Sequence, residues 1–366
     1  MNSNPRFLIT SKQLIFVIIG CILGTGYITL PREISAVSGQ DAWESIIIGS
    51  LLPLLSIFLF SKLGSIFPAL TVVEILQTLL GRIAGSLLSI LLIVYFLNAA
   101  AVVLRGMTEI VSTFMLPLTP TFVVAGLFGI TAWYSAKRGL KVVGRLNEIL
   151  FYVFLLALIS LVIPLVNADV TNLLPVFEAP PADLTKGAAA ASFAFSGIEI
   201  LLVVYPMVTR REEILKAGLT AVGCVLTIYL FITVICLLVF GSEALQHEMW
   251  PLLTLAKTQE IPVLQRGDLF FLLMLLGFGI KPVVNFVFAS SFCLVQILKQ
   301  DVNKYYSPLA LVLTVIILCL SLMPANTLAF FNYQRLIGIL SPIIGIGLPA
   351  VLLAVSRLGK GGATYA

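Results

Sequence analysis

The sequence of 366 residues predicts an all-α polytopic membrane protein with ten transmembrane helices. Three observations predict this class. Hydrophobic residues make up 60% of the chain, charged residues only 11%, and the mean hydropathy is +1.10, which no soluble domain of this size matches. The apolar residues fall into stretches long enough to cross a bilayer. The basic residues lie in alternate loops, as membrane topology requires.

A transmembrane helix needs about 20 mainly apolar residues. Ten stretches meet this requirement, and their boundaries are expected to be correct within several residues. They cover residues 13–35, 44–67, 84–113, 119–136, 147–167, 187–206, 216–241, 269–297, 307–324 and 336–356. We therefore expect a single transmembrane domain over 1–366, with one half at about 13–167 and the other at about 187–356.

The loops predict the orientation. If the N-terminus is cytoplasmic, 15 of the 22 Lys and Arg residues fall in inner segments: Arg6, Lys12, Lys62, Arg82, Lys137, Arg138, Lys141, Arg145, Arg210, Arg211, Lys216, Lys299, Lys304, Arg357 and Lys360. Only five fall in outer segments: Arg32, Lys186, Lys257, Arg266 and Arg335. This asymmetry favours ten spans with both chain ends inside.

The composition also argues against several classes of protein. The net charge of +5 comes from these short loops, so it does not predict nucleic-acid binding. All five cysteines lie inside apolar spans, which speaks against a disulfide framework or a CxxC metal site. The single histidine, His247, lies in a loop. Without a metal-ligand cluster or a phosphate-binding loop, we expect neither an enzyme nor a cofactor.

The first span contains CILGTGYITLP at residues 21–31, an unusual composition for a transmembrane helix. Gly24 lies twelve residues past Lys12, roughly 18 Å along a helix and so near the middle of the bilayer. Glycine lowers helix stability by about 1 kcal/mol relative to alanine, and Pro31 removes a backbone donor. Either Gly20 and Gly24 allow close helix packing, or the helix is interrupted and its backbone faces a cavity.

The sixth span, KGAAAASFAFSGIEILLVVYP at residues 186–206, favours the interrupted helix. It is rich in small residues, and Glu199 lies about thirteen residues past Lys186, again near mid-membrane. A carboxylate at that depth costs about 3 kcal/mol and usually faces an interior cavity. Spans one and six occupy corresponding positions in the two halves of the chain, and they cross the membrane in opposite directions. Two interrupted helices at such places indicate a binding site at the midplane.

Several motifs carry a resemblance to known proteins: ITSKQLIFVIIGCILGTGYITLP, FPALTVVEILQTLLGRIAG, FAFSGIE and GFGIKP. Together with ten spans, they resemble the amino acid–polyamine–organocation (APC) transporter superfamily. Within it, the chain resembles the spore germination permeases, the B subunits of nutrient germinant receptors. The resemblance covers nearly the whole chain. It implies a LeuT-like 5+5 inverted repeat with discontinuous helices 1 and 6.

The resemblance also implies a function. The expected activity is sensing of a small-molecule germinant, an amino acid, together with A- and C-type receptor subunits in the inner membrane of a bacterial spore. In the superfamily, the unwound first helix offers its positive end to a carboxylate, and the carbonyl ends of the sixth span suit an ammonium group. The implied ligand-binding residues are Gly24, Thr25, Gly26, Phe195, Ser196 and Gly197.

Further candidate ligand-binding residues are polar side chains inside spans. Lys281 and Asn285 lie in span eight, and Lys281 is too deep to reach an interface easily. No other acid is expected at that depth, so the sequence predicts that Glu199 and Lys281 pair or share a proton; a snorkelling lysine is the alternative. Tyr95 and Asn98 in span three lie near mid-depth and are expected to line the cavity.

Two other patterns have open interpretations. Arg105 and Glu109 are spaced to pair along one helix face, either as a structural pair or as an outer gate contact. Span ten contains SPIIGIGLP, which predicts a kinked helix that serves packing or gating. The outer loops 168–186 and 241–268 are long enough to form helices over the site.

Three functions fit the sequence. A nutrient sensor, favoured by the resemblance, would bind an amino acid and signal by a conformational change. A secondary amino-acid transporter is the alternative, and a passive ion or water pathway is the third. Two features argue against ion-coupled transport. Ser290 and Ser291 lie too near the inner end for a sodium site, and span five has no lysine between Phe151 and Pro164.

Overall fold

The computed structural model describes residues 4–258 and 267–358, with side chains of the second range from Phe271 onward. Throughout this part of the chain the regular structure is helical, apart from one isolated β-bridge. The α-helices are α1 (Ser11–Ile22), α2 (Gly26–Ser38), α3 (Ala42–Gly49), α4 (Leu51–Ile66), α5 (Val72–Leu80), α6 (Arg82–Phe114), α7 (Thr121–Ala136), α8 (Leu140–Ser160), α9 (Pro181–Ala190), α10 (Ile200–Val204), α11 (Ile214–His247), α12 (Pro251–Lys257), α13 (Gly267–Gly279), α14 (Lys281–Ile297), α15 (Val302–Leu322), α16 (Thr327–Pro342) and α17 (Leu348–Leu358).

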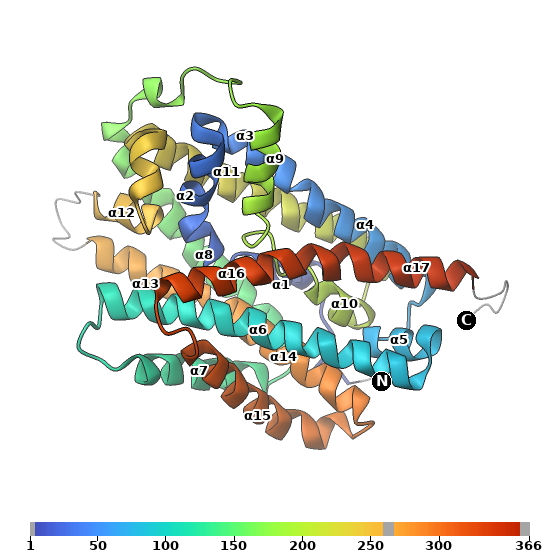
Figure 1. Ribbon diagram of the computed structural model, residues 1–366. Coiled ribbons are helices and arrows are strands. Elements are labelled where there is room, and N and C mark those ends of the chain that lie inside the picture. Colours follow the sequence, from blue (N-terminus) through green and yellow to red (C-terminus); the bar gives the residue numbers. More distant parts are fainter. Residues whose placement is uncertain (1–3, 259–266, 359–366) are drawn as a thin grey trace.

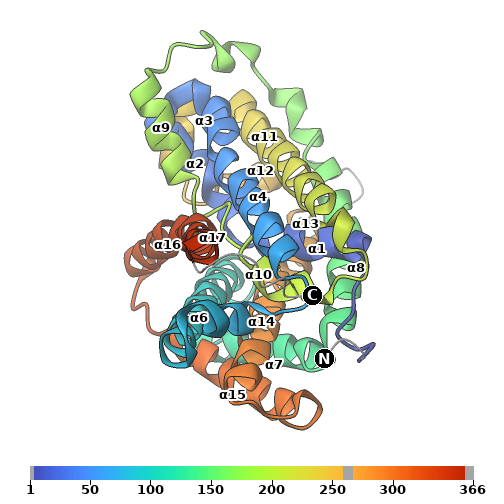
Figure 2. The same cartoon turned by 90° about the vertical axis from the view of Figure 1, so that its right-hand side faces the viewer.

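The helices form two groups with α1 between them (Figures 1 and 2). One group contains α2, α3, α4, α9 and α11, and the other contains α6, α7, α14 and α15. Helix α1 packs against α11 on one side and against α8 and α14 on the other. The N-terminal segment and the end of α17 lie at the same end of the molecule (Figure 1).

The first and sixth predicted spans are interrupted, as the sequence indicates. A capping box between Thr10 and Gln13 starts α1, which ends at Ile22; α2 starts at Gly26. The break covers residues 23–25, and Pro31 is accommodated inside α2. In the sixth span, residues 191–199 form turns between α9 and the short α10. Both interruptions fall at the glycine-containing motifs, where helix propensity is lowest.

Counting consecutive helices that run into one another as one, seven helices in the described residues are long and apolar enough to cross a membrane. Ser11–Ile22 and Thr121–Ala136 are shorter apolar helices. Large apolar side chains cover the outer faces of the bundle, including Leu127, Ile149, Leu156, Ile159, Val312 and Val315. Exposed apolar surface on this scale needs lipid. These features indicate an integral membrane protein. Helix occurs within each of the ten predicted ranges, whereas ten crossings and the inverted repeat stay predictions.

The N-terminal segment ties α1 to the chain that follows span six. Ile9 forms a parallel bridge with Val208, through Ile9 N–H to the Met207 carbonyl and Thr209 N–H to the Ile9 carbonyl, both at 3.0 Å. Lys12 on α1 also pairs with a glutamate of α8 at 2.8 Å. The ends of the two interrupted spans are therefore connected by the backbone at this end of the molecule.

Other predicted elements are also present. The predicted kink in span ten is a π-helical segment, Ile343–Gly347, between α16 and α17. Of the two loops predicted to be outer, 168–186 contains the start of α9 and 241–268 contains α12. Residues 259–266 of that second loop lie outside the described residues, so its proposed covering role stays a prediction.

Candidate functional site

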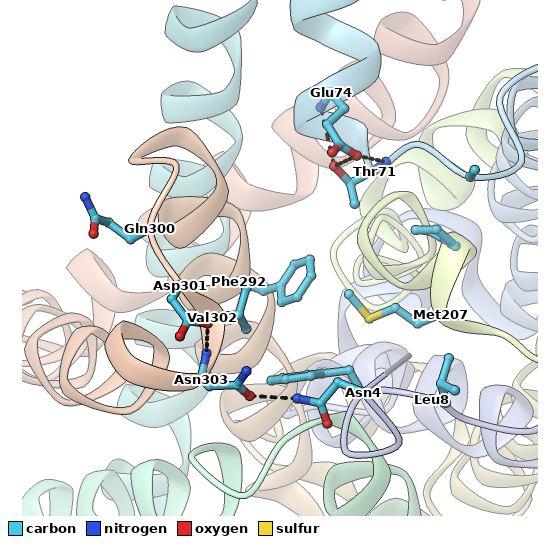
Figure 3. A pocket seen from close by; sticks show the side chains of 13 residues that line it. Asn4, Leu8, Thr71, Glu74, Met207, Phe292, Gln300, Asp301, Val302 and Asn303 are labelled. Carbon is cyan, nitrogen blue, oxygen red and sulfur yellow. Dashed lines mark hydrogen bonds between the residues drawn. The ribbon is translucent and has the colours of Figure 1, made fainter. Parts of the chain in front are cut away.

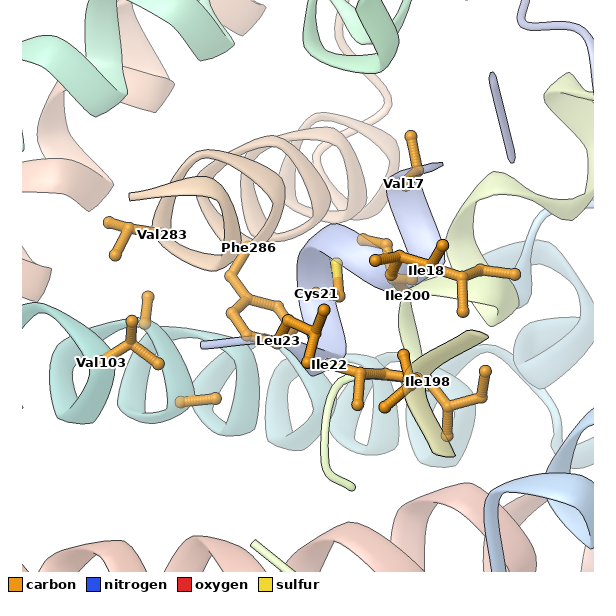
Figure 4. Packing of buried hydrophobic residues seen from close by; sticks show 14 of the residues in the cluster. Val17, Ile18, Cys21, Ile22, Leu23, Val103, Ile198, Ile200, Val283 and Phe286 are labelled. Carbon is orange, nitrogen blue, oxygen red and sulfur yellow. The ribbon is translucent and has the colours of Figure 1, made fainter. Parts of the chain in front are cut away.

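A small cavity lies between the two helix breaks. It measures about 10 Å³ and is lined from span one by Cys21, Ile22, Gly24, Thr25 and Gly26, from span six by Phe193 and Ser196, and by Ala99, Val103 and Phe286. This volume holds about one water molecule, whereas ligand pockets measure about 300–1,000 Å³. Figure 4 shows apolar side chains, among them Cys21, Val103 and Phe286, closing around the break. The structure therefore represents a closed state.

The sequence-predicted glycines allow close approach of the two broken spans. Gly197 has φ +114°, and a Cβ on it would lie 2.6 Å from the Cys21 carbonyl oxygen. A Cβ on Gly26 would lie 2.9 Å from the Cα of Ala194 and 3.1 Å from the ring of Phe193. A larger residue at either position would force the unwound segments apart.

Tyr229 on α11 joins the two breaks, and sequence analysis did not select it. Its buried hydroxyl donates to the Ala194 carbonyl at 2.5 Å and lies 3.3 Å from the Ile22 carbonyl. Phe195 packs edge-on against the same ring, with centroids 5.1 Å apart, and does not line the cavity. A single tyrosine in an apolar helix gives no sequence signal for this role, because tyrosine is common in such helices.

Glu199 is the last residue of the span-six turns; it is fully buried and has protein partners. One carboxylate oxygen accepts a hydrogen bond from the Gly197 N–H at 2.7 Å, and the other accepts a short bond from the hydroxyl of Ser341 on α16. The Tyr95 hydroxyl on α6 interacts with the same carboxylate but completes no hydrogen bond. Tyr95 therefore lies beside Glu199 and is not among the residues that line the cavity, and Ser341 is a further member of this cluster.

The predicted ion pair between Glu199 and Lys281 is wrong for this structure. Lys281 is fully buried, but its Nζ lies 3.0 Å from the centroid of the Phe278 ring and has no hydrogen-bond partner among the described residues. Equal depth places two side chains at one level of a bundle but does not fix the direction in which each points. Burial of an unpaired ammonium costs several kcal/mol.

Asn285 lies in a different cluster from the one predicted. It forms a reciprocal amide pair with Asn147 on α8, with N···O distances of 2.9 and 3.2 Å. Gly20 on α1 makes room for this pair, since a Cβ there would lie 1.7 Å from the Asn147 amide oxygen. The pair therefore holds α1, α8 and α14 together. Asn147 was missed because it occurs at the start of a predicted span, where polar residues are common.

Asn98 also lies away from the cavity. It is half-buried, and its amide oxygen accepts a hydrogen bond of 2.5 Å from the hydroxyl of Tyr333 on α16. In contrast, the predicted pairing of Arg105 with Glu109 is confirmed, with an N···O distance of 2.5 Å. Ser290 and Ser291 donate to carbonyls of their own helix, at Phe286 and Val287.

A larger pocket of about 540 Å³ lies near the N-terminal segment (Figure 3). Its polar lining groups mostly bond to one another: Asn4 donates to Asn303 at 2.7 Å, Asp301 accepts from the Asn303 N–H at 3.0 Å, and Glu74 accepts from the Thr71 N–H at 2.8 Å. Because these groups cap helices, they assign no ligand to the pocket. Among the described residues, no cluster of three or more His, Cys, Asp or Glu residues could hold a metal ion.

Comparison with known proteins gives consistent matches. Residues 8–328 match a family described as "Spore germination protein". Spore germination protein YndE of Bacillus subtilis (strain 168) is 26% identical over 98% of this chain and 99% of the relative. Spore germination protein KB of the same organism is 27% identical over 77% and 76% of the two chains. Spore germination protein GerQB of Bacillus cereus is 24% identical over 77% and 78%.

Among solved structures, the chain resembles a Na⁺-coupled sialic acid symporter in a substrate-bound, outward-open state. The TM-score is 0.70, covering 95% of this chain and 80% of the symporter, at 12% sequence identity. At this identity the likeness concerns the fold alone, which is that of a helical transporter.

Proposed function

This chain belongs to the spore germination protein family, and we propose that it is the nutrient-sensing membrane subunit of a germinant receptor. The germinant is an amino acid that binds at the midplane between the breaks of spans one and six. The receptor acts in the inner membrane of the spore, with both chain ends in the cytoplasm and with A- and C-type subunits as partners. Binding there changes the conformation of the bundle and signals to those partners.

The observation that carries this proposal is the meeting of two broken helices at one closed cavity. Thr25, the residue that precedes α2, makes no side-chain cap, and its hydroxyl has no partner among the described residues. The first N–H groups of a helix lack intrahelical partners and favour an anion such as a carboxylate. The turns at 191–199 offer carbonyl groups to an ammonium. An amino acid carries both groups.

The closed cavity supports signalling by a shift between two states. A cavity of about 10 Å³ has no room for an amino acid, so the ligand must favour a more open arrangement of spans one and six. The Tyr229 hydroxyl, which lies between the carbonyls of Ile22 and Ala194, holds the closed arrangement. A ligand that replaces these contacts would release the two spans from each other.

The alternative is a secondary amino-acid transporter; the likeness to a Na⁺-coupled symporter concerns the fold and does not favour this activity. A transporter must carry ligand across the membrane, whereas a sensor needs only to bind it.

Two measurements on the purified chain test the proposal. Thermal unfolding against each of the twenty amino acids should reveal specific stabilisation, because ligand bound to the native state raises the unfolding midpoint. Gly26→Trp should abolish that stabilisation, since Gly26 already contacts Ala194 closely. The same amino acid should not accumulate in proteoliposomes containing the chain. Gradient-driven uptake would establish the transporter instead, and stabilisation by no amino acid would contradict both functions.

A further inference from the structure

Lys281 carries a buried amine that has no anionic partner among the described residues. It is the first residue of α14 and has 0% exposure, and its Nζ lies over the Phe278 ring. Phe278 is in turn stacked on Phe154 of α8, with centroids 3.8 Å apart. An aromatic face recovers only part of the solvation that an ammonium loses on burial. The described part of the structure therefore leaves this amine without a counter-charge.

The amine lies beside the cavity between the helix breaks. Pro282, the next residue, has its Cγ 3.4 Å from the position that a Cβ on Gly24 would take. Cys21 lines that cavity. In Figure 4 the Cys21 sulfur and the Phe286 ring, one turn along α14, lie close together at the break.

The start of a helix lies at the same point. The helix α2 begins at Gly26, and Gly24 at the break lies close to Pro282, the residue after Lys281. The N-terminus of α2 carries a partial positive charge, to which a protonated Lys281 amine adds. The Glu199 carboxylate does not pair with this amine, because it is bonded to Ser341 and Gly197.

We propose that Lys281 binds the carboxylate of the ligand, so that the receptor recognises nutrients that carry a free carboxylate. This rests on the proposed function, because it requires a ligand between the two breaks. The four-carbon stem of lysine has freely rotating bonds. When spans one and six separate, the amine leaves the Phe278 ring and turns toward the side of Cys21, where the carboxylate also meets the start of α2.

The test compares each of the twenty L-amino acids with its carboxamide, by thermal unfolding of the purified full chain at a series of concentrations. In the wild type, a stabilising amino acid should bind about 10- to 100-fold more tightly than its amide, as expected for a buried charged hydrogen bond. In Lys281→Met this preference should shrink markedly, because only the start of α2 still favours the carboxylate, and Lys281→Arg should retain more of the preference. Lys137→Met is the matched control, since Lys137 also lies over an aromatic ring, 4.0 Å from the Trp133 centroid.

The unliganded proteins provide a second readout. Lys281→Met removes an unpartnered buried amine, so its unfolding midpoint should equal or exceed that of the wild type. A lower midpoint would mean that Lys281 is structural and would overturn the inference. Two results would overturn the inference and leave the proposed function intact. The wild type could bind amide and acid equally, or Lys281→Met could keep the full preference for the acid. Stabilisation by no amino acid would overturn both.

Discussion

Removing the Tyr229 hydroxyl should loosen the two helix breaks. In Tyr229→Phe, the Ala194 carbonyl loses its hydrogen bond of 2.5 Å, and the Ile22 carbonyl loses its contact at 3.3 Å. The Ile22 carbonyl keeps the Gly24 N–H at 2.9 Å, so one buried acceptor is left unpaired. That loss costs about 1–3 kcal/mol. If local opening controls exchange, amide hydrogens in the breaks should exchange about 5- to 150-fold faster.

Hydrogen–deuterium exchange with mass spectrometry measures this directly on peptides covering 22–26 and 191–199. Tyr306→Phe is the matched control, because Tyr306 is also fully buried and its hydroxyl donates to a carbonyl, that of Ala136, at 2.7 Å. It should lower overall stability without accelerating exchange at the breaks. Unchanged exchange at the breaks in Tyr229→Phe, or equal acceleration in both variants, would refute the assigned role of Tyr229.

Three further predictions concern stability, and each is checked by the unfolding midpoint. Gly20→Ala should lower the free energy of unfolding by about 1–3 kcal/mol, because the added methyl group displaces the buried amide pair of α8 and α14. Gly126→Ala is the control and should leave stability unchanged, because a Cβ there meets no atom within 4 Å. Equal unfolding midpoints for the two variants would contradict this prediction. Ser341→Ala should cost about 1–3 kcal/mol, because the buried Glu199 carboxylate loses a donor, and an unchanged midpoint would show that the bond contributes nothing. In the loop 168–186, hydrogen bonds from the hydroxyl and the N–H of Thr171 lower the pKa of Asp169. The contribution of Asp169 to stability should be full above the ordinary carboxyl pKa of about 3.9 and vanish as the pH falls through the lowered value. Asp169→Asn should therefore be less stable than the wild type at pH 7 and equal to it at strongly acidic pH.

The sequence predicted features that depend on depth along a helix. The breaks in spans one and six lie at the glycine motifs, because weak helix propensity is a local property. The Arg105–Glu109 pair was also predictable, because a separation of four residues fixes two side chains on one face of one helix.

Features that depend on the rotation of one helix relative to another were not predictable. Glu199 and Lys281 lie at similar expected depths, yet one bonds to Ser341 and the other lies over Phe278. Asn98 likewise faces α16 instead of the cavity. The sequence gives the positions of these residues along the chain, but their partners depend on how separate helices pack.

The partners that sequence analysis missed share one property. Tyr229 lies inside a span and Asn147 at the start of one, and neither belongs to a motif that predicts its partner. Their importance comes from the backbone carbonyls and amides that packing brings to them, at Ala194 and Asn285. Such residues become recognisable only when the unsatisfied groups near them are known.

The central claim is that an amino acid binds between the two helix breaks, and one pair of variants tests it most directly. Gly24→Val adds a side chain inside the cavity, where a Cβ would already lie 3.2 Å from Val103 and 3.4 Å from Pro282. Gly126→Val is the control, because it makes the same change at an open position on α7. The account predicts that an amino acid that stabilises the wild type against thermal unfolding also stabilises Gly126→Val, but not Gly24→Val. Equal stabilisation of both variants would place the ligand elsewhere and contradict the account.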